Sequence, residues 1–408
     1  MHKIKMISAI AATLVLAGCA SEPEAPPVKT AEDLAYISDS PPLKKARSDK
    51  VVAPLFEDPA MSETRAVIVM HRGEIIAERY GEGYDEDTRF ISWSMAKSFT
   101  GALIGFLVSD GRLVLDDPAP VPAWQRSGDP RGDITLRHLI HMSSGLDHTE
   151  VPEEGGKTIY QADTNRMLFM DGASDMAGYA EARPPEAGPG EKFEYSTATS
   201  MILADIITRT LTSSKDPAVR RQAADRFIRG RLLEPLGMDS TYFEYDANGT
   251  FLGGSIIQAT ARDYATFGEF LRHKGAKKGA QHLPVNWVNF MRSSSENDPA
   301  YGGHIWLNKK RPEGRGQVLF PDNGPDTIFA ALGHLGQQIV VSPDQKLTVV
   351  RLGKTQDDVL APVHAQITVA GEVVTLVRMD ATSSLTVNGV SVLDSHPLAP
   401  GDIIVIGE

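Results

Sequence analysis

A serine and a lysine stand three residues apart in Ser94-Met-Ala-Lys97, the only Ser-x-x-Lys in the chain. On a helix such a pair shares one face, so the two side chains are neighbours. A serine hydroxyl becomes a nucleophile when a base takes its proton, and a lysine can act as that base once burial lowers its pKa. Trp93, Met95 and Phe99 supply apolar surroundings. The pattern alone also fits a helix-capping serine beside a surface lysine.

Two further segments carry groups that the same reaction needs. Tyr195 follows a Pro-Gly turn and precedes an apolar helix, and a phenol beside a lysine can relay a proton. Gly333-His334-Leu335-Gly336-Gln337 opens a strand, where a glycine allows a substrate backbone to approach closely. Taken singly, Tyr195 also reads as a packed tyrosine and His334 as a core or turn histidine.

In this order the three segments resemble the serine β-lactamase and penicillin-binding-protein superfamily, specifically its class C branch. That branch carries Ser-x-x-Lys, then Tyr-x-Asn, then Lys-Thr-Gly or a His-x-Gly substitute. The flanking phrases are most similar to those of 6-aminohexanoate-dimer hydrolases and β-lactamase-like esterases; they run over Phe90 to Leu103, Ile134 to Leu146 and Tyr301 to Leu307. The resemblance covers about Arg65 to Gly353.

The resemblance implies acyl transfer that needs neither a metal nor another cofactor. Lys97 and Tyr195 would act as base for Ser94, which attacks an ester or amide carbonyl and forms an acyl-enzyme. The backbone N–H groups of Ser94 and Gln337 would form the oxyanion hole. By the same resemblance, the substrate would contact His334, Gly336 and Thr197.

Two departures from the family pattern concern the substrate. Thr197 stands where many relatives carry Asn, which weakens the expectation of amide recognition as in β-lactamases. His334 stands where β-lactamases carry Lys, so a fixed cation for a β-lactam carboxylate is missing unless His334 is protonated. We therefore expect cleavage of small esters or amides. A peptidoglycan-directed D-Ala-D-Ala carboxypeptidase or β-lactamase, and a catalytically silent envelope binding protein, are the alternatives.

Helices and strands must position these residues. The sequence pattern predicts an α/β fold, with an antiparallel sheet flanked by helices and a mostly helical lobe. Apolar alternation predicts a hairpin over Arg65 to Gly83 and two strands within Gln337 to Gly353. Helical spacing predicts a buried helix over Ser94 to Val108. Further helices are expected over Thr199 to Leu211 and Ala261 to His273.

The C-terminal segment predicts a small all-β appendage, so that the hydrolase domain spans 51–361 and the appendage 362–408. Strands are expected over 366–369, 373–377, 385–387, 390–393 and 403–406. The segments starting at Thr386 and Pro400 resemble the closing hairpin of forkhead-associated domains. Because that family's phosphate-reading Arg and Ser loops are not found, we expect a structural unit.

The single cysteine of the chain, Cys19, lies at its N-terminal end. Lys3 and Lys5 precede an apolar run that ends in Leu16-Ala17-Gly18-Cys19, which resembles a bacterial lipoprotein signal. Residues 1–18 would then be a signal peptide, Cys19 the lipidation site and 19–50 a flexible linker. We expect a lipid-anchored envelope protein on the periplasmic face of the outer membrane, held to the membrane through this lipid only.

Composition excludes several other classes of protein. The chain has 408 residues, 41% of them hydrophobic, and a formal net charge of -12. A strongly acidic chain is a poor ligand for nucleic acid, so the expected partners are small ester, amide or peptide-like substrates. One cysteine permits no intrachain disulfide and no thiolate-rich zinc site. His138 and His141 have the spacing of a metal pair, but without a third ligand we predict no metal site.

Overall fold

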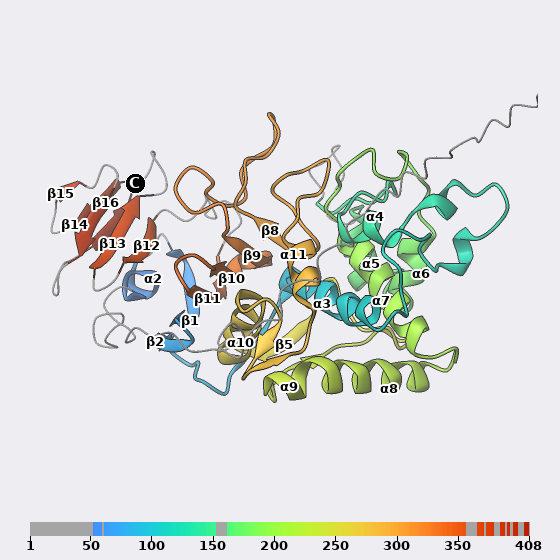
Figure 1. The fold of residues 1–408 in the computed structure, drawn as a ribbon, viewed down its shortest axis with the longest axis horizontal. Coiled ribbons are helices and arrows are strands. Elements are labelled where there is room, and N and C mark those ends of the chain that lie inside the picture. Colours follow the sequence, from blue (N-terminus) through green and yellow to red (C-terminus); the bar gives the residue numbers. More distant parts are fainter. Residues whose placement is uncertain are drawn as a thin grey trace, which may run out of the picture.

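The computed structural model describes residues 52–58, 61–151 and 161–355, together with short strands between 365 and 407. A six-stranded antiparallel sheet lies to the left of the helices α3 (Ala96–Ser109) to α7 (Thr197–Leu211) in Figure 1. Its order is β2 (Glu74–Tyr80), β1 (Glu63–His71), β11 (Leu347–Lys354), β10 (Gln337–Ser342), β9 (Phe329–Gly333) and β8 (Trp306–Leu307). The predicted hairpin forms because Arg72 and Gly73, at φ 57° and 87°, supply the left-handed pair that a two-residue turn needs.

Both faces of the sheet are covered. Helix α10 (Ala261–Arg272) packs on one face so closely that a Cβ at Gly268 would lie 2.7 Å from side-chain atoms of Ile339 and Thr348. On the other face of β1, Val67 packs with Val52 beside the short helix α2 (Pro54–Glu57). Cover on both sides explains why β1 and β11 are buried along most of their length.

Helix α3 (Ala96–Ser109) is buried along nearly its whole length, and a single 3-10 turn, η2 (Trp93–Met95), precedes it. Helices α7 (Thr197–Leu211) and α11 (Val285–Met291) pack against it. Gly105 makes the second contact possible, because a Cβ there would lie 2.2 Å from the indole of Trp287. The motif serine lies in η2, which contacts β9 and β10 of the sheet, while α7 of the helical lobe packs on the following helix α3.

The helical lobe and its borders hold the remaining elements. The helices are α4 (Leu136–Ile140), α5 (Asp163–Phe169), α6 (Met176–Glu181), α8 (Pro217–Ile228), the π-helix η5 (Arg229–Leu233) and α9 (Glu234–Leu236). Two small sheets join β3 (Arg89–Ile91), β5 (Ile257–Thr260) and β4 (Tyr242–Phe243), and β6 (Ala276–Lys277) with β7 (Ala280–Gln281). The 3-10 turns η3 (Pro122–Trp124) and η4 (Pro130–Asp133) lie in the loop before α4.

The C-terminal strands form two three-stranded sheets, drawn in red in Figure 1. One joins β12 (Ala365–Ala370), β13 (Val373–Arg378) and β16 (Ser395–Leu398); the other joins β15 (Val390–Ser391), β14 (Ser384–Val387) and β17 (Ile404–Gly407). The sequence predicts all of these except β16, which contains Pro397. Because β16 is an edge strand, it tolerates a proline there.

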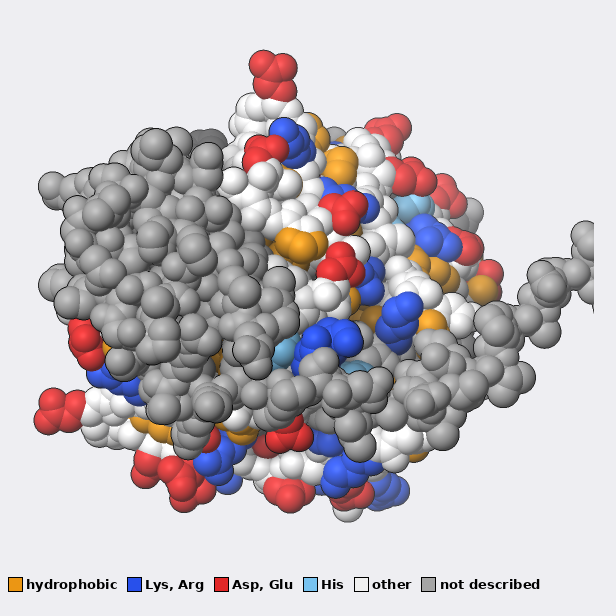
Figure 2. All heavy atoms as spheres, turned by 60° about the vertical axis from the view of Figure 1, so that its left-hand side comes forward, with side chains coloured by type: hydrophobic (Ala, Val, Ile, Leu, Met, Phe, Trp, Pro, Cys, Tyr) orange, Lys and Arg blue, Asp and Glu red, His pale blue; other side chains and the backbone are white. Residues whose placement is uncertain are grey.

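The predicted fold class is confirmed: an antiparallel sheet flanked by helices, a helical lobe and a C-terminal β region. In the part of the chain that the structure describes, no helix has the length and apolar character to cross a bilayer. Acidic and basic side chains are interspersed over the described part of the face in Figure 2. The predicted signal peptide, Cys19 and the whole of the predicted linker, residues 1–50, lie outside the described residues.

Candidate active site

Ser94 lies in the 3-10 turn η2, next to a strained backbone. Trp93 has φ 44°, a left-handed conformation that is unfavourable for a bulky residue. Ser92 fixes the turn, because its hydroxyl accepts a hydrogen bond from the N–H of Ile257 at 3.0 Å. Gly333, at the end of β9, lets the sheet approach: a Cβ there would lie 2.3 Å from the carbonyl oxygen of Ser92. The nucleophile candidate is thus held between the sheet and α3.

Lys97 is buried beneath Ser94, with only 2% of its surface exposed. Its Nζ lies 2.9 Å from Ser94 Oγ, 2.8 Å from Thr197 Oγ1 and 2.8 Å from the carbonyl oxygen of Gly254. Burial lowers the pKa of Lys97 to about 8, although the charge of Glu150 acts in the opposite direction. About a tenth of the amine is therefore neutral at pH 7 and about half at pH 8, which makes Lys97 available as a general base.

Tyr195 reaches the same serine from the loop before α7, and its phenol interacts with the side chain of Ser94. The ring lies with its face 4.8 Å from Lys97 Nζ and stacks on Trp306, with ring centroids 5.3 Å apart. Burial, and secondly the charge of Glu150, raise the pKa of Tyr195 above its ordinary value. The phenol is consequently a proton donor rather than a tyrosinate base.

Thr197 is the first residue of α7, and Ser196 caps that helix by accepting a hydrogen bond from Thr199 N–H. The sequence predicts a substrate contact for Thr197, but the structure buries it, with 2% exposed. Its hydroxyl accepts from Lys97 Nζ and donates to Glu150 Oε1 at 2.6 Å. The hydrogen of the hydroxyl and one of its two lone pairs are therefore engaged by protein groups.

Glu150 is the site residue that sequence reasoning missed. Its Oε2 accepts hydrogen bonds from the backbone N–H of Thr197 and from Thr164 Oγ1, each at 2.6 Å. A lone glutamate in a loop has no spacing that marks it. The one available signal for such an acceptor was Thr197. A buried hydroxyl that replaces an amide needs a second partner to accept its hydrogen.

The predicted His334 to Gln337 segment forms the tight connection between β9 and β10. His334 is exposed, and its ring meets the indole of Trp93 edge-on with centroids 5.5 Å apart. Gly336 has φ 79°, and a Cβ there would lie 2.3 Å from Arg351 Nη1. The glycine is thus required by packing on its protein side, while contact with a substrate stays a prediction.

Gln337 holds this connection together through its side chain, which is buried. Its Nε2 donates to the carbonyl oxygen of His334 at 3.1 Å and of Gly353 at 2.7 Å, and its Oε1 accepts from Gly353 N–H at 3.1 Å. The sequence predicts a role only for the backbone N–H of Gln337. The structure adds a cross-link from the turn to the end of β11.

An aromatic cluster flanks Tyr195. Trp306 and Tyr301 pack against each other with centroids 4.8 Å apart, and Tyr301 packs on Phe193 at 5.3 Å. Two arginines cover this cluster and share the buried Asp298; they are Arg311, over Trp306, and Arg315, over Phe193. The cluster fixes the position of the phenol ring.

The two histidines with metal-like spacing have structural partners. His138 Nδ1 accepts from Thr135 N–H in a capping box at the start of α4, and His141 stacks on Phe290 with centroids 5.0 Å apart. Among the described residues, no group of three or more His, Cys, Asp or Glu side chains is arranged to hold a metal ion.

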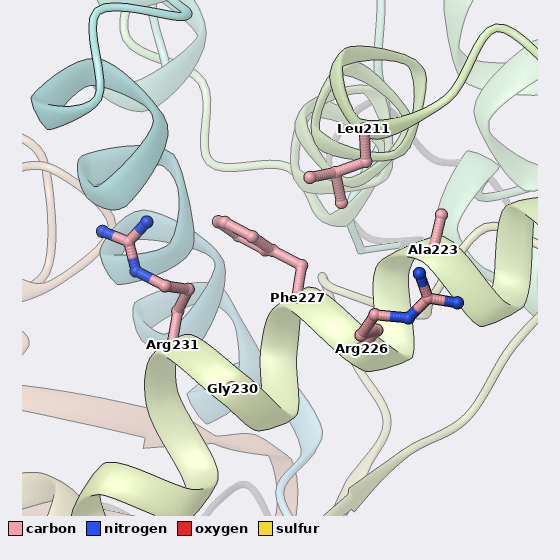
Figure 3. A pocket seen from close by; sticks show the side chains of 6 residues that line it. All are labelled: Leu211, Ala223, Arg226, Phe227, Gly230 and Arg231. Carbon is pink, nitrogen blue, oxygen red and sulfur yellow. The ribbon is translucent and has the colours of Figure 1, made fainter.

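A hollow of about 390 Å³ lies elsewhere, between the end of α7 and α8 with η5 (Figure 3). Leu211, Ala223 and Phe227 form its apolar part, and Arg226 and Arg231 lie beside them. Arg231 is paired with Asp110. Its lining has no nucleophile and no acid or base group suited to acyl transfer, so the reactive constellation is the one around Ser94.

Comparison with known proteins agrees with this geometry. The Beta-lactamase family profile matches residues 56–369, and the FHA domain profile matches residues 337–407. The second match extends well beyond the closing hairpin noted in the sequence and overlaps the hydrolase sheet from β10 onward. The overlap leaves the boundary between the two units a prediction.

The 6-aminohexanoate-dimer hydrolase of Paenarthrobacter ureafaciens is 26% identical over 231 residues, which cover 55% of this chain and 56% of the relative. The chain thus spans about half the length of that curated relative. A Bacillus anthracis protein described as a 6-aminohexanoate-dimer hydrolase has a TM-score of 0.60 at 24% identity, over 75% of this chain and 78% of that one.

A D-stereospecific amidohydrolase from Streptomyces sp. has a TM-score of 0.52 at 16% identity, over 77% of this chain and 95% of that one. At these identities the two solved structures show a shared fold. The profile match, which covers most of the chain, shows the family. With Ser94, Lys97 and Tyr195 in mutual contact, the chain belongs to the β-lactamase family of serine hydrolases.

Proposed function

We propose that the protein hydrolyses small esters or amides through an acyl-enzyme on Ser94, with Lys97 as general base. One observation carries the proposal: Lys97 Nζ lies buried at 2.9 Å from Ser94 Oγ, and burial lowers the pKa of Lys97 to about 8. A base needs both hydrogen-bond reach and a pKa near the working pH. Lys97 combines the two.

In the proposed cycle, Lys97 takes the hydroxyl proton of Ser94 while Oγ attacks the substrate carbonyl carbon. The tetrahedral oxyanion is held by the backbone N–H groups of Ser94 and Gln337, the pair that the family resemblance implies, each worth about 3 kcal/mol. Tyr195 gives its phenol proton to the leaving group as the bond breaks, and Lys97 returns a proton to Tyr195. Water then attacks the acyl-enzyme, and the same groups release Ser94.

The proposed substrate class rests on the exposed rim of the site. His334 is exposed beside Trp93, in the position where β-lactamases carry a lysine for the β-lactam carboxylate. The relatives named above are a 6-aminohexanoate-dimer hydrolase and a D-stereospecific amidohydrolase, both named for amide cleavage. We therefore place small linear amides and esters ahead of β-lactams and of D-Ala-D-Ala peptides.

A covalent trap tests the serine chemistry. The protein is treated with a fluorophosphonate or a labelled penicillin, digested and analysed by mass spectrometry, with Ser94→Ala as the control. We expect an adduct on the peptide that carries Ser94, and none in the variant. A folded wild-type protein that acquires no adduct refutes the proposal.

Product analysis separates the substrate classes. Short-chain nitrophenyl esters, the 6-aminohexanoate dimer, a D-Ala-D-Ala peptide and a chromogenic cephalosporin are compared by kcat/KM. We expect the esters or the linear amide to lead. A D-Ala-D-Ala peptide that leads instead would establish the carboxypeptidase, and an adduct without turnover of any of them would establish a silent binding protein.

We also propose that the enzyme works at the cell envelope, tethered through lipid on Cys19. The support is the sequence alone, namely Leu16-Ala17-Gly18-Cys19 behind a short apolar run. Cells fed a labelled fatty acid should label the wild type but not Cys19→Ser. The proposal fails if the variant still fractionates with outer membranes and carries the label.

A further inference from the structure

Lys97 makes three contacts, and their chemistry decides where a neutral amine directs its lone pair. The carbonyl oxygen of Gly254 can only accept a hydrogen bond. Thr197 Oγ1 can accept or donate, and Ser94 Oγ must give up its proton in the reaction. A neutral amine has two hydrogens to donate and one lone pair to accept with. If two of the three partners accept those hydrogens, the lone pair is left for the third partner.

Glu150 determines which role Thr197 plays. Glu150 Oε1 lies 2.6 Å from Thr197 Oγ1, and a carboxylate only accepts, so the hydroxyl hydrogen of Thr197 is directed at Glu150. The oxygen then presents a lone pair to Lys97 Nζ at 2.8 Å. The two hydrogens of neutral Lys97 go to Thr197 and Gly254, and its lone pair faces Ser94.

We infer that Glu150 is a positioning residue for the general base: by fixing the hydroxyl of Thr197 as an acceptor, it directs the lone pair of Lys97 at Ser94. This inference rests on the proposed function of the same site. It also accounts for Thr197 in place of the family's Asn. An amide oxygen is an acceptor whatever surrounds it, whereas a hydroxyl needs a carboxylate to make it one.

The substitution Glu150→Gln tests the direction of these bonds with little change of shape. The amide oxygen must take the Oε2 position, where it accepts from Thr197 N–H and from Thr164. The amide NH2 then takes the Oε1 position and donates to Thr197 Oγ1. The hydroxyl hydrogen of Thr197 turns to the nearest remaining acceptor, the lone pair of Lys97.

We expect Glu150→Gln to lower kcat by roughly 100-fold or more, the usual size of a lost general base, with KM little changed. The pH profile supplies a second readout. The charge of Glu150 raises the pKa of Lys97, and the other titratable groups around the amine, Tyr195 and His304, are neutral at working pH because burial shifts their pKa values. The variant should therefore move the acidic limb of kcat/KM to lower pH.

A double-mutant cycle separates positioning from mere support of the fold. Thr197→Asn supplies an acceptor that does not depend on residue 150, so we expect it to stay within about tenfold of the wild type and the cost of Glu150→Gln in that background to fall below about tenfold. A purely structural role of Glu150 predicts the same cost in both backgrounds. That result, or a wild-type kcat in Glu150→Gln, overturns the inference.

Two controls complete the experiment. Glu78→Gln on β2 removes the same charge from a carboxylate that binds Tyr80 and Arg262, far along the sheet, and should leave kcat and the pH profile unchanged. The fluorophosphonate adduct on Ser94 is measured in parallel. A wild type that forms no adduct refutes the proposed function, whereas a wild type and a Glu150→Gln variant that form it equally fast refute only the inference.

Discussion

The amine of Lys97 faces the ring of Tyr195 at 4.8 Å, and both side chains interact with Ser94: Lys97 Nζ is hydrogen-bonded to its Oγ, and the phenol of Tyr195 lies beside it. Burial acts on the two groups in opposite senses. It lowers the pKa of Lys97 and raises the pKa of Tyr195, so that each is neutral when the serine attacks. The proton acceptor and the proton donor are thereby distinguished before any substrate binds.

The pH dependence of the reaction follows from this arrangement. The base must be unprotonated, so kcat/KM should rise with pH and level off above the pKa of Lys97, which burial places at about 8. A nitrophenyl ester followed at a wavelength independent of its product's ionisation provides the profile. An acidic limb near the ordinary lysine pKa of 10.5 would show that the free enzyme does not bury this amine.

Replacing Tyr195 by Phe should separate leaving-group protonation from attack. The ring keeps its packing on Trp306 and Tyr301, and only the hydroxyl at Ser94 is lost. We expect kcat to fall by roughly 100-fold or more for an alkyl ester or amide, whose leaving group needs a proton, and by much less for a nitrophenyl ester. Equal losses on both substrates would place Tyr195 in the attack step instead.

Replacing Lys97 by Met should abolish turnover without loss of stability. The pKa of the wild-type Lys97 falls from 10.5 in the unfolded chain to about 8 in the folded protein. This difference destabilises the folded protein with a charged Lys97 by about 3 kcal/mol. Below pH 8 the unfolded chain binds this proton more readily than the folded one, which favours unfolding, and the penalty fades as the pH rises toward 10.5.

At pH 7 the variant should therefore unfold at the same or a higher urea concentration than the wild type, despite the lost contacts to Thr197 and Gly254. Ser94→Ala is the matched inactive control and should leave stability unchanged. A clear drop in the free energy of unfolding of Lys97→Met would mean that its hydrogen bonds outweigh its desolvation.

Gly336→Ala should be costly for two separable reasons. The residue has φ 79°, and the added Cβ would lie 2.3 Å from Arg351 Nη1, which hydrogen-bonds the carbonyl oxygen of Gly336. We expect a loss of roughly 2–4 kcal/mol in urea unfolding and a fall in kcat, because Gln337 follows directly.

Gly314→Ala supplies the comparison for the backbone effect alone. Gly314 has φ 86° and no atom within 4 Å of its added Cβ. Its loss should be only about 1 kcal/mol, with activity retained. Equal losses in the two variants would mean that contact with Arg351 is unimportant.

The sequence was sufficient for the parts of the site that a motif marks. Ser94 and Lys97 are three residues apart, and because the 3-10 turn η2 runs directly into α3, their contact follows from helical geometry. Tyr195 was found through a turn followed by an apolar helix. Alternation and turn residues predicted β1, β2, β10 and β11 of the main sheet, but not β8 and β9. In the predicted elements the local pattern and the tertiary structure agree.

Other features depend on contacts between distant segments. Glu150 meets Thr197 across 47 positions of the chain, and no local pattern connects them. The Gln337 side chain reaches Gly353 on a neighbouring strand. The small sheet of β3, β5 and β4 was missed because strands of two to four residues have too few positions to show alternation.

The pairing of Glu150 with Thr197 also constrains the order in which this site can change by single substitutions. If Thr197 changes to Asn first, the intermediate remains active, because Glu150 can accept a hydrogen bond from the new amide as it did from the hydroxyl. If Glu150 changes to Gln first, the intermediate has a misdirected base. The two orders of substitution therefore pass through intermediates of different activity. Laboratory evolution under selection for turnover should acquire Thr197→Asn before Glu150→Gln.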